Sequence, residues 1–346
     1  MKALVYHGPG RRSWDDKPEP TIEQPTGAIV KIFRTTICGT DLHILKGDVP
    51  TVTDGRTLGH EGVGVVTAVG TAVSVFAVGD HVLISCITSC GKCASCRRGM
   101  TSHCEQGGWI LGNTLDGTQA DFVRIPFADT SLYAVPPGAD EDALVMLSDI
   151  LPTGFECGVL KGQVKPGDTL AIVGAGPIGL AVLMTAQFYA PSEVIVIDLD
   201  DHRLEVARDF GATRTINSGS GDAALQVLAA TGGKGVDVAV EAVGLPATFE
   251  LCQDILAPGG HLANVGVHGR AVELKLQKLW SHNVTITTQL VDTTTIPLLL
   301  RSVVSGRLQA RKLITHEFLL GDLMKAYDAF GNAGKEKALK VLVRAG

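Results

Sequence analysis

Aromatic residues are scarce in this chain, at 5% of its 346 residues. A core with so few aromatic rings must rely on Ala, Val, Leu and Ile. Charged residues make up only 19% while hydrophobic residues reach 45%, which excludes a disordered chain and a coiled coil. The length exceeds what a single hydrophobic core usually organises, so two domains are expected.

A positive charge excess is missing as well. Lys and Arg number 30 against 36 Asp and Glu, which gives a formal net charge of −6. Proteins that bind duplex DNA usually carry a strong basic excess, so nucleic acid is not expected as a partner. Gly is abundant, at 41 residues, which indicates many tight turns and close backbone approaches.

No segment has the pattern of an export signal or a membrane span. The chain has no apolar stretch before Arg11 and Arg12, as a signal peptide would require. Residues 169–192 carry no charge and are long enough to span a membrane, but Gly and Pro residues at 174–179 interrupt them. A buried strand, a glycine turn and a buried helix explain them better. We therefore expect a cytoplasmic protein with no membrane partner.

Four of the eight cysteines stand in one short segment, Cys90-x2-Cys93-x2-Cys96-x7-Cys104. Intracellular proteins rarely form disulfides, so clustered cysteines are typical of a metal site. Glycine and basic residues lie between them, which favours flexible turns and thiolate groups. Tetrahedral zinc needs four soft ligands that tight turns can bring together, so the spacing predicts a closed structural zinc site. An iron–sulfur cluster is the alternative.

A glycine fingerprint, G-x-G-x-x-G at 174–179, follows a predicted strand at 170–173 and opens an apolar helix. A second strand is predicted at 194–197, and this context is what a dinucleotide-binding fold requires. The glycines allow a tight turn, the approach of a pyrophosphate to the helix N-terminus, and close packing of helix on strand. The predicted cofactor-binding turn comprises Gly174, Gly176, Pro177, Ile178 and Gly179.

Asp198 ends the second predicted strand, where an acidic residue would bind the adenosine ribose hydroxyls. Its negative charge would repel a 2′-phosphate, so NAD is predicted over NADP, although the nearby Arg203 would soften that preference. The alternative for Asp198 is a helix N-cap or a solvated loop end.

Strands and helices continue to alternate after Asp198. We predict helices at 201–210 and 246–256, strands at 236–240 and 262–265, and a turn at 258–260. This alternation predicts a doubly wound parallel sheet. Residues 1–150 differ, because short β-like runs punctuated by Gly and Pro predict a mostly β domain without regular helices; these runs lie at 29–33, 63–69 and 81–84.

Three polar motifs stand in this β-rich part: CGTDLH at 38–43, GHE at 59–61, and Ser148-Asp149. The run Gly59-His60-Glu61-x2-Gly64-x5-Gly70-x2-Val73 fits, at every fixed position, the zinc signature of the zinc-dependent medium-chain alcohol dehydrogenases. CGTDLH, the four-cysteine segment and GAGPIG follow in the order of that family. The chain therefore resembles this family from end to end, with some features of its bacterial secondary-alcohol branch.

The resemblance implies an α/β chain, in which a doubly wound parallel Rossmann sheet is inserted in a mostly β, GroES-like catalytic domain with a structural zinc lobe. We place the catalytic domain at 1–152 and 292–346, its zinc lobe at about 86–108, and the dinucleotide-binding domain at 153–291. Residues 284–288 would form an edge strand that pairs subunits, so the resemblance implies a homodimer or homotetramer.

The resemblance also implies a catalytic zinc with three protein ligands. Cys38 and His60 match the first two. The third is commonly a cysteine, but Asp149 stands at the matching position, as in the secondary-alcohol branch. Cys157 is the second candidate, although it is more typical of a buried structural thiol. Glu61 would lie beside the metal or serve as an exchanging fourth ligand.

In the mechanism that the resemblance implies, zinc lowers the pKa of a bound alcohol, and the zinc-bound alkoxide passes a hydride to NAD. Thr40 would accept the proton and hand it through the nicotinamide ribose to His43. Alternatively, Thr40 and Asp41 cap a helix that begins near Leu42, and His43 lies exposed. We expect Asp41 to be structural.

The substrate pocket is expected between the domains, lined by apolar groups. The resemblance places Cys86, Trp109 and Leu290 there, although Trp109 would also suit a core position. Few polar groups stand at these places, which favours a small primary or secondary alcohol, and the corresponding aldehyde or ketone, over a polyol or a charged substrate. Lys340 stands where the family has a basic residue near the pyrophosphate, and a solvated surface lysine is the alternative.

Other functions agree less well with the sequence. Polyol- and threonine-type dehydrogenases share the metal motifs and form the main alternative. A nucleic-acid-binding zinc module is disfavoured by the acidic charge. A zinc nucleobase deaminase needs His-x-Glu, whereas His60 and Glu61 are adjacent. A dinucleotide-binding protein without catalysis would leave Cys38 and His60 without a purpose. We therefore predict an NAD-dependent alcohol dehydrogenase with one catalytic and one structural zinc per chain.

Overall fold

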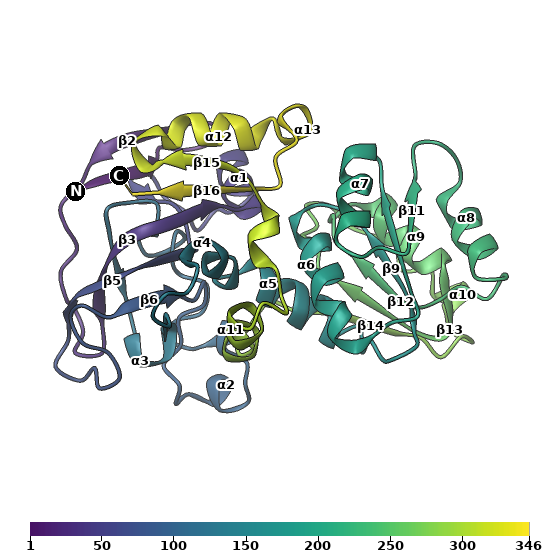
Figure 1. Ribbon diagram of the computed structural model, residues 1–346, viewed down its shortest axis with the longest axis horizontal. Helices are drawn as coiled ribbons and strands as arrows, with labels where there is room; N and C mark the ends of the chain where they lie inside the picture. The colour runs from purple at the N-terminus through teal and green to yellow at the C-terminus, as the bar shows by residue number, and fades with distance from the viewer. Residues whose placement is uncertain (346) are drawn as a thin grey trace. The chain divides into compact units, whose positions relative to one another are not determined.

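The structure is a computed structural model that describes residues 1–345 and divides the chain into two compact units (Figure 1). The first, the split unit, combines Met1–Asp149 with the chain from Asp292 onward. The second, the inserted unit, is the continuous segment Ile150–Val291. The sequence-based expectation places the two switches near Thr153 and Val291.

The split unit is built on a sheet of seven strands. Six follow the order β15-β16-β3-β5-β6-β8, and β7 pairs with β3. β15 and β16 are parallel, whereas the other pairs are antiparallel. The strands are β3 (Ala28–Ile37), β5 (Gly62–Val69), β6 (His81–Ile84), β7 (Phe122–Ile125), β8 (Leu132–Ala134), β15 (Ile314–Leu319) and β16 (Lys340–Arg344). A smaller sheet, ordered β2-β1-β4, comprises β1 (Lys2–Tyr6), β2 (Arg12–Asp16) and β4 (Arg56–Thr57).

Helices of the split unit are short. The α-helices are α1 (Gly39–Lys46), α2 (Ala94–Arg97), α3 (Ala128–Ser131), α4 (Glu141–Leu144), α11 (Ile296–Val304), α12 (Leu323–Gly331) and α13 (Ala333–Glu336). Single 3-10 turns are η1 (Thr101–His103), η2 (Val145–Leu147), η5 (Ala310–Leu313) and η6 (Leu320–Asp322).

Helix α1 corrects the expectation that residues 1–150 contain no regular helix. It begins at Gly39, because Cys38 is extended and its backbone N–H is bound by Asp41 Oδ2 at 2.9 Å. Thr40 and Asp41 are thus part of the first turn, and the expected start near Leu42 is too late. Eight residues are too few to show a clear apolar period in the sequence.

Two large, mostly aliphatic clusters lie in the core of the split unit. One gathers side chains of β1, α1, α12 and β16, among them Leu4, Ile44 and Tyr327. The other fills the space within the curved sheet of β3, β5, β6 and β7. Figure 1 shows α12 running along β15 and β16, where it closes the first core. Aliphatic side chains dominate both cores, as the low aromatic content predicts.

The inserted unit contains one parallel sheet of six strands in the order β11-β10-β9-β12-β13-β14. This is the 3-2-1-4-5-6 order of a dinucleotide-binding fold. The strands are β9 (Thr169–Val173), β10 (Glu193–Asp198), β11 (Arg214–Asn217), β12 (Val236–Glu241), β13 (Leu256–Asn264) and β14 (Thr285–Thr288). β14 ends this order, in agreement with the edge strand expected at 284–288. The fold class predicted from the sequence is confirmed.

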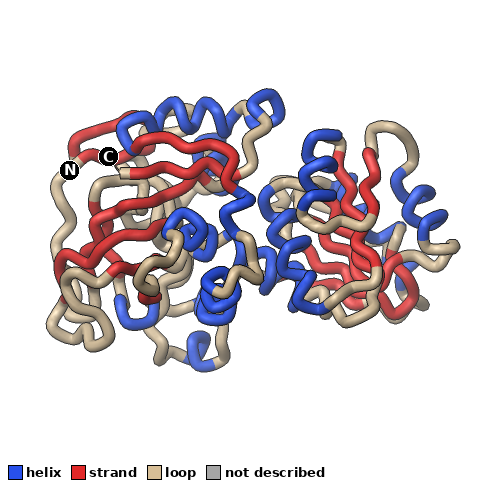
Figure 2. The backbone as a smooth tube through the Cα atoms, in the orientation of Figure 1, coloured by secondary structure: helices blue, strands red, loops and turns tan. Residues whose placement is uncertain are grey.

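Helices lie on both faces of the parallel sheet (Figure 2). They are α5 (Ile150–Thr153), the π-helix η3 (Gly154–Leu160), α6 (Pro177–Ala186), the 3-10 turn η4 (Gln187–Tyr189), α7 (Asp201–Asp209), α8 (Ala223–Ala230), α9 (Pro246–Asp254) and α10 (Leu276–Leu279). Within residues 1–345, no single helix is long and apolar enough to cross a membrane, and two short apolar segments, 141–147 and 150–160, pass that test only as a bent pair.

The expected turn at 258–260 is wrong. These residues stay within β13, and the pairing of β12 with β13 shifts register between Val236 and Val238. Gly259 has φ +81 and donates its N–H to His282 O at 2.7 Å. Pro-Gly-Gly therefore forms an irregularity inside a strand, which is a common position for Pro and Gly besides turns.

Candidate metal centres and nucleotide-binding site

The four-cysteine segment forms a compact sulfur cluster in the split unit. The Sγ atoms of Cys90, Cys93, Cys96 and Cys104 all lie within 4.8 Å of one another. Cys90 Sγ and Cys96 Sγ are 4.0 Å apart, close to the roughly 3.8 Å edge of a tetrahedron with zinc–sulfur bonds of about 2.3 Å. The donor set and its spacing fit a tetrahedral metal ion.

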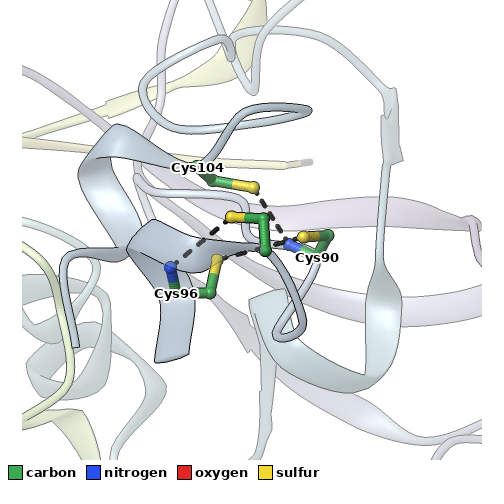
Figure 3. Close-up of side chains that lie close together, drawn as sticks. Cys90, Cys96 and Cys104 are labelled. Carbon is green, nitrogen blue, oxygen red and sulfur yellow. Dashed lines mark hydrogen bonds between the residues drawn. The ribbon is translucent and has the colours of Figure 1, made fainter. Parts of the chain in front are cut away.

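Backbone N–H groups support the sulfurs of this cluster (Figure 3). Cys90 N lies 3.2 Å from Cys104 Sγ, and Cys93 caps α2 by accepting from Cys96 N at 3.5 Å. Backbone N–H groups of Cys96 and Glu105 lower the pKa of Cys93 to about 6, whereas burial raises the pKa of Cys96 to about 12. Cys93 is thus largely a thiolate near neutral pH and able to bind a metal cation.

Cys38, His60 and Asp149 form a second cluster, which we call the three-residue cluster. Their ligand atoms lie within 4.8 Å of one another. Asp149 Oδ2 is 3.6 Å from Cys38 Sγ and 3.3 Å from His60 Nε2. One sulfur, one nitrogen and one oxygen suit a zinc ion that keeps a fourth position open. The structure therefore brings together the three residues that the sequence comparison with the family singled out, and their role as ligands stays a prediction.

Each ligand of the three-residue cluster stands at the end of a regular element. Cys38 caps α1, His60 lies two residues before the strand β5, and Asp149 lies two residues after η2. Ser148 fastens the segment before Asp149, because its Oγ accepts from Gly62 N at 3.1 Å and its carbonyl accepts from Cys86 N at 3.0 Å. The ends of these packed elements thus fix the positions of the ligands.

The three-residue cluster favours a positive charge. Burial lowers the pKa of His60, but hydrogen bonds to Asp149 and Cys38 outweigh burial, so the pKa lies well above the ordinary value of histidine. His60 is only 4% exposed, so water cannot supply this stabilisation. A divalent cation would be held by the same negative ligands.

Glu61 and Lys340 form a buried ion pair behind His60. Each is 1% exposed, and Lys340 Nζ donates to Glu61 Oε2, to Thr36 Oγ1 at 3.1 Å and to Ile37 O at 3.3 Å. The alternative of a solvated surface lysine is therefore wrong. Contact of Lys340 with a pyrophosphate, and contact of Glu61 with a metal, stay predictions.

Helix α1 carries the two residues of the predicted proton path. Thr40 Oγ1 lies 3.7 Å from Cys38 Sγ, so the hydroxyl adjoins the three-residue cluster. His43 follows one turn later, its side chain 37% exposed and its Nδ1 2.8 Å from Asp48 Oδ2. Asp41 is wholly buried and binds the N–H of Cys38, which agrees with the structural role expected for it.

Two of the three predicted substrate residues adjoin the three-residue cluster. The Trp109 ring meets His60 edge-on, with ring centroids 6.3 Å apart, and Cys86 is buried next to the segment of Ser148. Leu290 belongs to the inserted unit and is 45% exposed. Cys157, the second candidate for the third ligand, is buried in η3 of the inserted unit. Contact of these residues with substrate stays a prediction.

The glycine turn between β9 and α6 has the shape that a nucleotide needs. A Cβ at Gly179 would lie 1.8 Å from Gly174 O, so close packing requires this glycine. A Cβ at Gly176 would meet only Arg203 Nη1, at 3.8 Å, so protein packing leaves that position open to a ligand. Pro177 and Ile178 begin α6, whose N-terminus points its free N–H groups at this space. The turn fits a pyrophosphate group.

Asp198 ends β10 beside this turn. Its Oδ2 accepts from Ala175 N at 2.7 Å, and its Oδ1 accepts from Asp200 N at 3.0 Å. The residue that caps α7 is Asp200, which accepts from His202 N at 2.9 Å, so the alternative of an N-cap role for Asp198 is wrong. Asp198 thus shapes the glycine turn from the edge where its carboxylate would meet a ribose.

Sequence reasoning missed several polar residues around these sites. Thr36 and Gln119 are buried beside the three-residue cluster, and neither belongs to a motif. Glu241 is buried at the end of β12, where it accepts from Gly244 N at 2.9 Å, and His268 Nε2 lies 3.4 Å from it. The position of Glu241 at the carboxyl end of a predicted strand was the one available signal.

Comparisons with known proteins agree with this geometry. Residues 24–137 match the alcohol dehydrogenase GroES-like domain, and residues 177–305 match the zinc-binding dehydrogenase domain. An alcohol dehydrogenase of Cupriavidus necator is 36% identical over 364 residues, which cover 99% of this chain and 98% of that protein. The fold and the two ligand clusters thus define a zinc-type dehydrogenase of the medium-chain class.

Solved structures extend the agreement to three dimensions. The apo form of zinc dependent alcohol dehydrogenase 2 from Streptococcus pneumonia has a TM-score of 0.96 at 52% identity, covering 100% of this chain and 98% of that one. Alcohol dehydrogenase TADH from Thermus sp. ATN1 has a TM-score of 0.93 at 34% identity, covering 100% of both chains. The chain belongs to the zinc-dependent alcohol dehydrogenases of the medium-chain family.

Proposed function

We propose that the protein reversibly oxidises small primary or secondary alcohols to aldehydes or ketones, with NAD as the hydride acceptor. The observation that carries this proposal is the three-residue cluster, whose sulfur, nitrogen and oxygen atoms lie within 4.8 Å of one another in a chain of this family. Zinc bound there would polarise an alcohol hydroxyl and lower its pKa. The four-cysteine cluster would hold the second, structural zinc.

The residues around the three-residue cluster are proposed to transfer protons, to limit the size of the substrate and to support the metal ligands. Thr40, whose hydroxyl adjoins Cys38, is the proposed proton acceptor for the substrate hydroxyl. His43 exchanges protons with solvent, because its ring is partly exposed and Asp48 fixes its orientation through Nδ1. Trp109 and Cys86 would limit the size of the alcohol. Glu61 and Lys340 would keep the segment that carries His60 in place.

Cofactor choice is proposed to depend on Asp198. Its carboxylate stands at the end of β10 and would accept from the ribose hydroxyls of NAD while repelling a 2′-phosphate. Arg203, whose guanidinium lies by Gly176, would moderate the preference. Leu290 is a further proposed substrate contact, and Lys340 is a proposed contact of the cofactor pyrophosphate. We also propose a homodimer or homotetramer in which the edge strand β14 pairs subunits.

The experiment that tests this proposal is a steady-state assay of the purified protein. NADH or NADPH formation would be followed with ethanol, 2-propanol, 2-butanol, benzyl alcohol, 2,3-butanediol, sorbitol and threonine. The proposal expects the highest kcat/KM on a simple alcohol with NAD. Preferential turnover of sorbitol or threonine would replace it with the polyol- or threonine-type activity, and preferential use of NADP would overturn the cofactor assignment.

A further inference from the structure

A buried chain of hydrogen bonds reaches the three-residue cluster from helix α12. Tyr327 Oη lies 2.8 Å from Gln119 Oε1. Gln119 Nε2 donates to Asp41 Oδ2 at 3.0 Å and to Thr36 O at 3.1 Å. Asp41 Oδ2 also accepts from the backbone N–H of Cys38, at 2.9 Å. The side chains of Tyr327, Gln119 and Asp41 are at most 2% exposed, so water does not replace any of these hydrogen bonds.

The partners leave the amide of Gln119 only one orientation. Thr36 O is a carbonyl and can only accept, so the NH2 group of the amide must face Thr36 and Asp41. Gln119 Oε1 then faces Tyr327, and the tyrosine hydroxyl must donate to it. The carbonyl of Thr36 therefore fixes the amide orientation that stabilises the carboxylate of Asp41, and the hydroxyl of Tyr327 supplies the donor that the amide oxygen then needs.

Gln119 also contacts the segment that carries His60. Its backbone N–H donates to Leu58 O at 3.0 Å. A Cβ at Gly59 would lie 2.6 Å from Gln119 Cγ, so the Gln119 side chain packs directly on the residue before His60. A single side chain thus supports both chain segments that supply Cys38 and His60, which are 22 positions apart in the sequence.

We infer that Gln119 and Tyr327 are positioning residues for the catalytic metal site. The amide of Gln119 binds Asp41, whose carboxylate in turn binds the backbone N–H of Cys38. The side chain of Gln119 also packs on Gly59, the residue before His60. Without the amide, the carboxylate of Asp41 would keep the N–H of Cys38 as its donor at Oδ2 and lose the other. This inference rests on the proposed function, in which the three-residue cluster binds zinc.

The test uses Gln119→Met, which keeps the side-chain length without the amide, and Tyr327→Phe, which removes only the hydroxyl. Tyr6→Phe is the matched control, because Tyr6 lies in the same core and outside this hydrogen-bonded chain. Zinc per chain would be measured during dialysis against a chelator. The absorption spectrum of the cobalt-substituted protein would report the ligand geometry independently of activity. The four-cysteine cluster serves as an internal reference.

We expect Gln119→Met to weaken metal binding at the three-residue cluster by about 10- to 100-fold, the usual effect of removing a group that supports a metal ligand. Tyr327→Phe should weaken it by a smaller factor and alter the same cobalt bands. Tyr6→Phe should match the wild type, and the four-cysteine metal should stay bound in all three variants.

The inference is overturned if both variants retain metal and show the cobalt spectrum of the wild type. Loss of both metals together would also overturn it, because that outcome reports a general loss of structure. If Gln119→Met does not fold, the conservative Tyr327→Phe decides alone. A wild-type protein that binds metal only at the four cysteines would instead refute the proposed function, and the two failures are therefore distinct.

Discussion

The buried ion pair of Glu61 and Lys340 leads to a quantitative prediction for Lys340→Met. Methionine fills most of the space of the lysine stem but removes the ammonium group. Glu61 is 1% exposed, and the Thr36 hydroxyl would then be the only donor left to its Oε2 within residues 1–345. Burial lowers the pKa of Lys340, but the negative charges of Glu61 and Cys38 outweigh burial and raise it, so the wild-type lysine is charged at neutral pH.

Breaking a buried pair by removing one partner typically costs about 3–5 kcal/mol. Because both partners are fully buried, the expected loss for Lys340→Met lies in this range. The double variant Lys340→Met/Glu61→Gln should recover most of it, since it removes the uncompensated charge. Urea unfolding at saturating zinc, followed by far-UV circular dichroism, measures both. A loss below about 1 kcal/mol, or a double variant no more stable than the single one, would show that the pair does not act as a buried ion pair that stabilises the fold.

Two further predictions concern the glycine turn and the four cysteines. Asp198→Gly should narrow the preference for NAD over NADP by roughly tenfold, because a carboxylate near a phosphate is lost, and an unchanged ratio of kcat/KM values would show that Asp198 does not contact the ribose. After zinc removal, Cys93 should react with iodoacetamide at pH 7 well before Cys96, because their pKa values are about 6 and about 12, and its rate should fall below pH 6. Peptide mass spectrometry would measure both rates, and equal rates would contradict the assignment.

Sequence patterns predicted those elements of the inserted unit that have long apolar runs or a glycine turn. The apolar run before Gly174, the glycine turn and the charge-free helix after it agree with β9 and α6. β11 was missed, because Arg214–Asn217 is short and largely polar and lies at the sheet edge. The Pro-Gly-Gly run at 258–260 predicted a turn wrongly, because these residues occur in turns and in strand irregularities alike.

In the candidate site too, residues close together in the sequence were predictable and distant ones were not. Spacing alone predicted the four-cysteine cluster, because its ligands are neighbours in the chain. Asp149 lies 111 residues from Cys38, and only the family resemblance pointed to it. Lys340 lies 279 residues from Glu61, and no local signal distinguishes it from a surface lysine. Gln119 is a neutral residue outside any motif, so its role depends entirely on tertiary contacts.

The catalytic metal site is tested most directly by zinc content measured together with NADH formation, for the wild type and for Asp149→Ala. We predict two zinc ions per wild-type chain and turnover of a simple alcohol. Asp149→Ala should keep the zinc of the four cysteines, lose most of the second zinc, and lose activity in proportion. One zinc per wild-type chain and no turnover, or an Asp149→Ala variant that retains two zinc ions and full activity, would contradict the assignment of Cys38, His60 and Asp149 as the catalytic metal site.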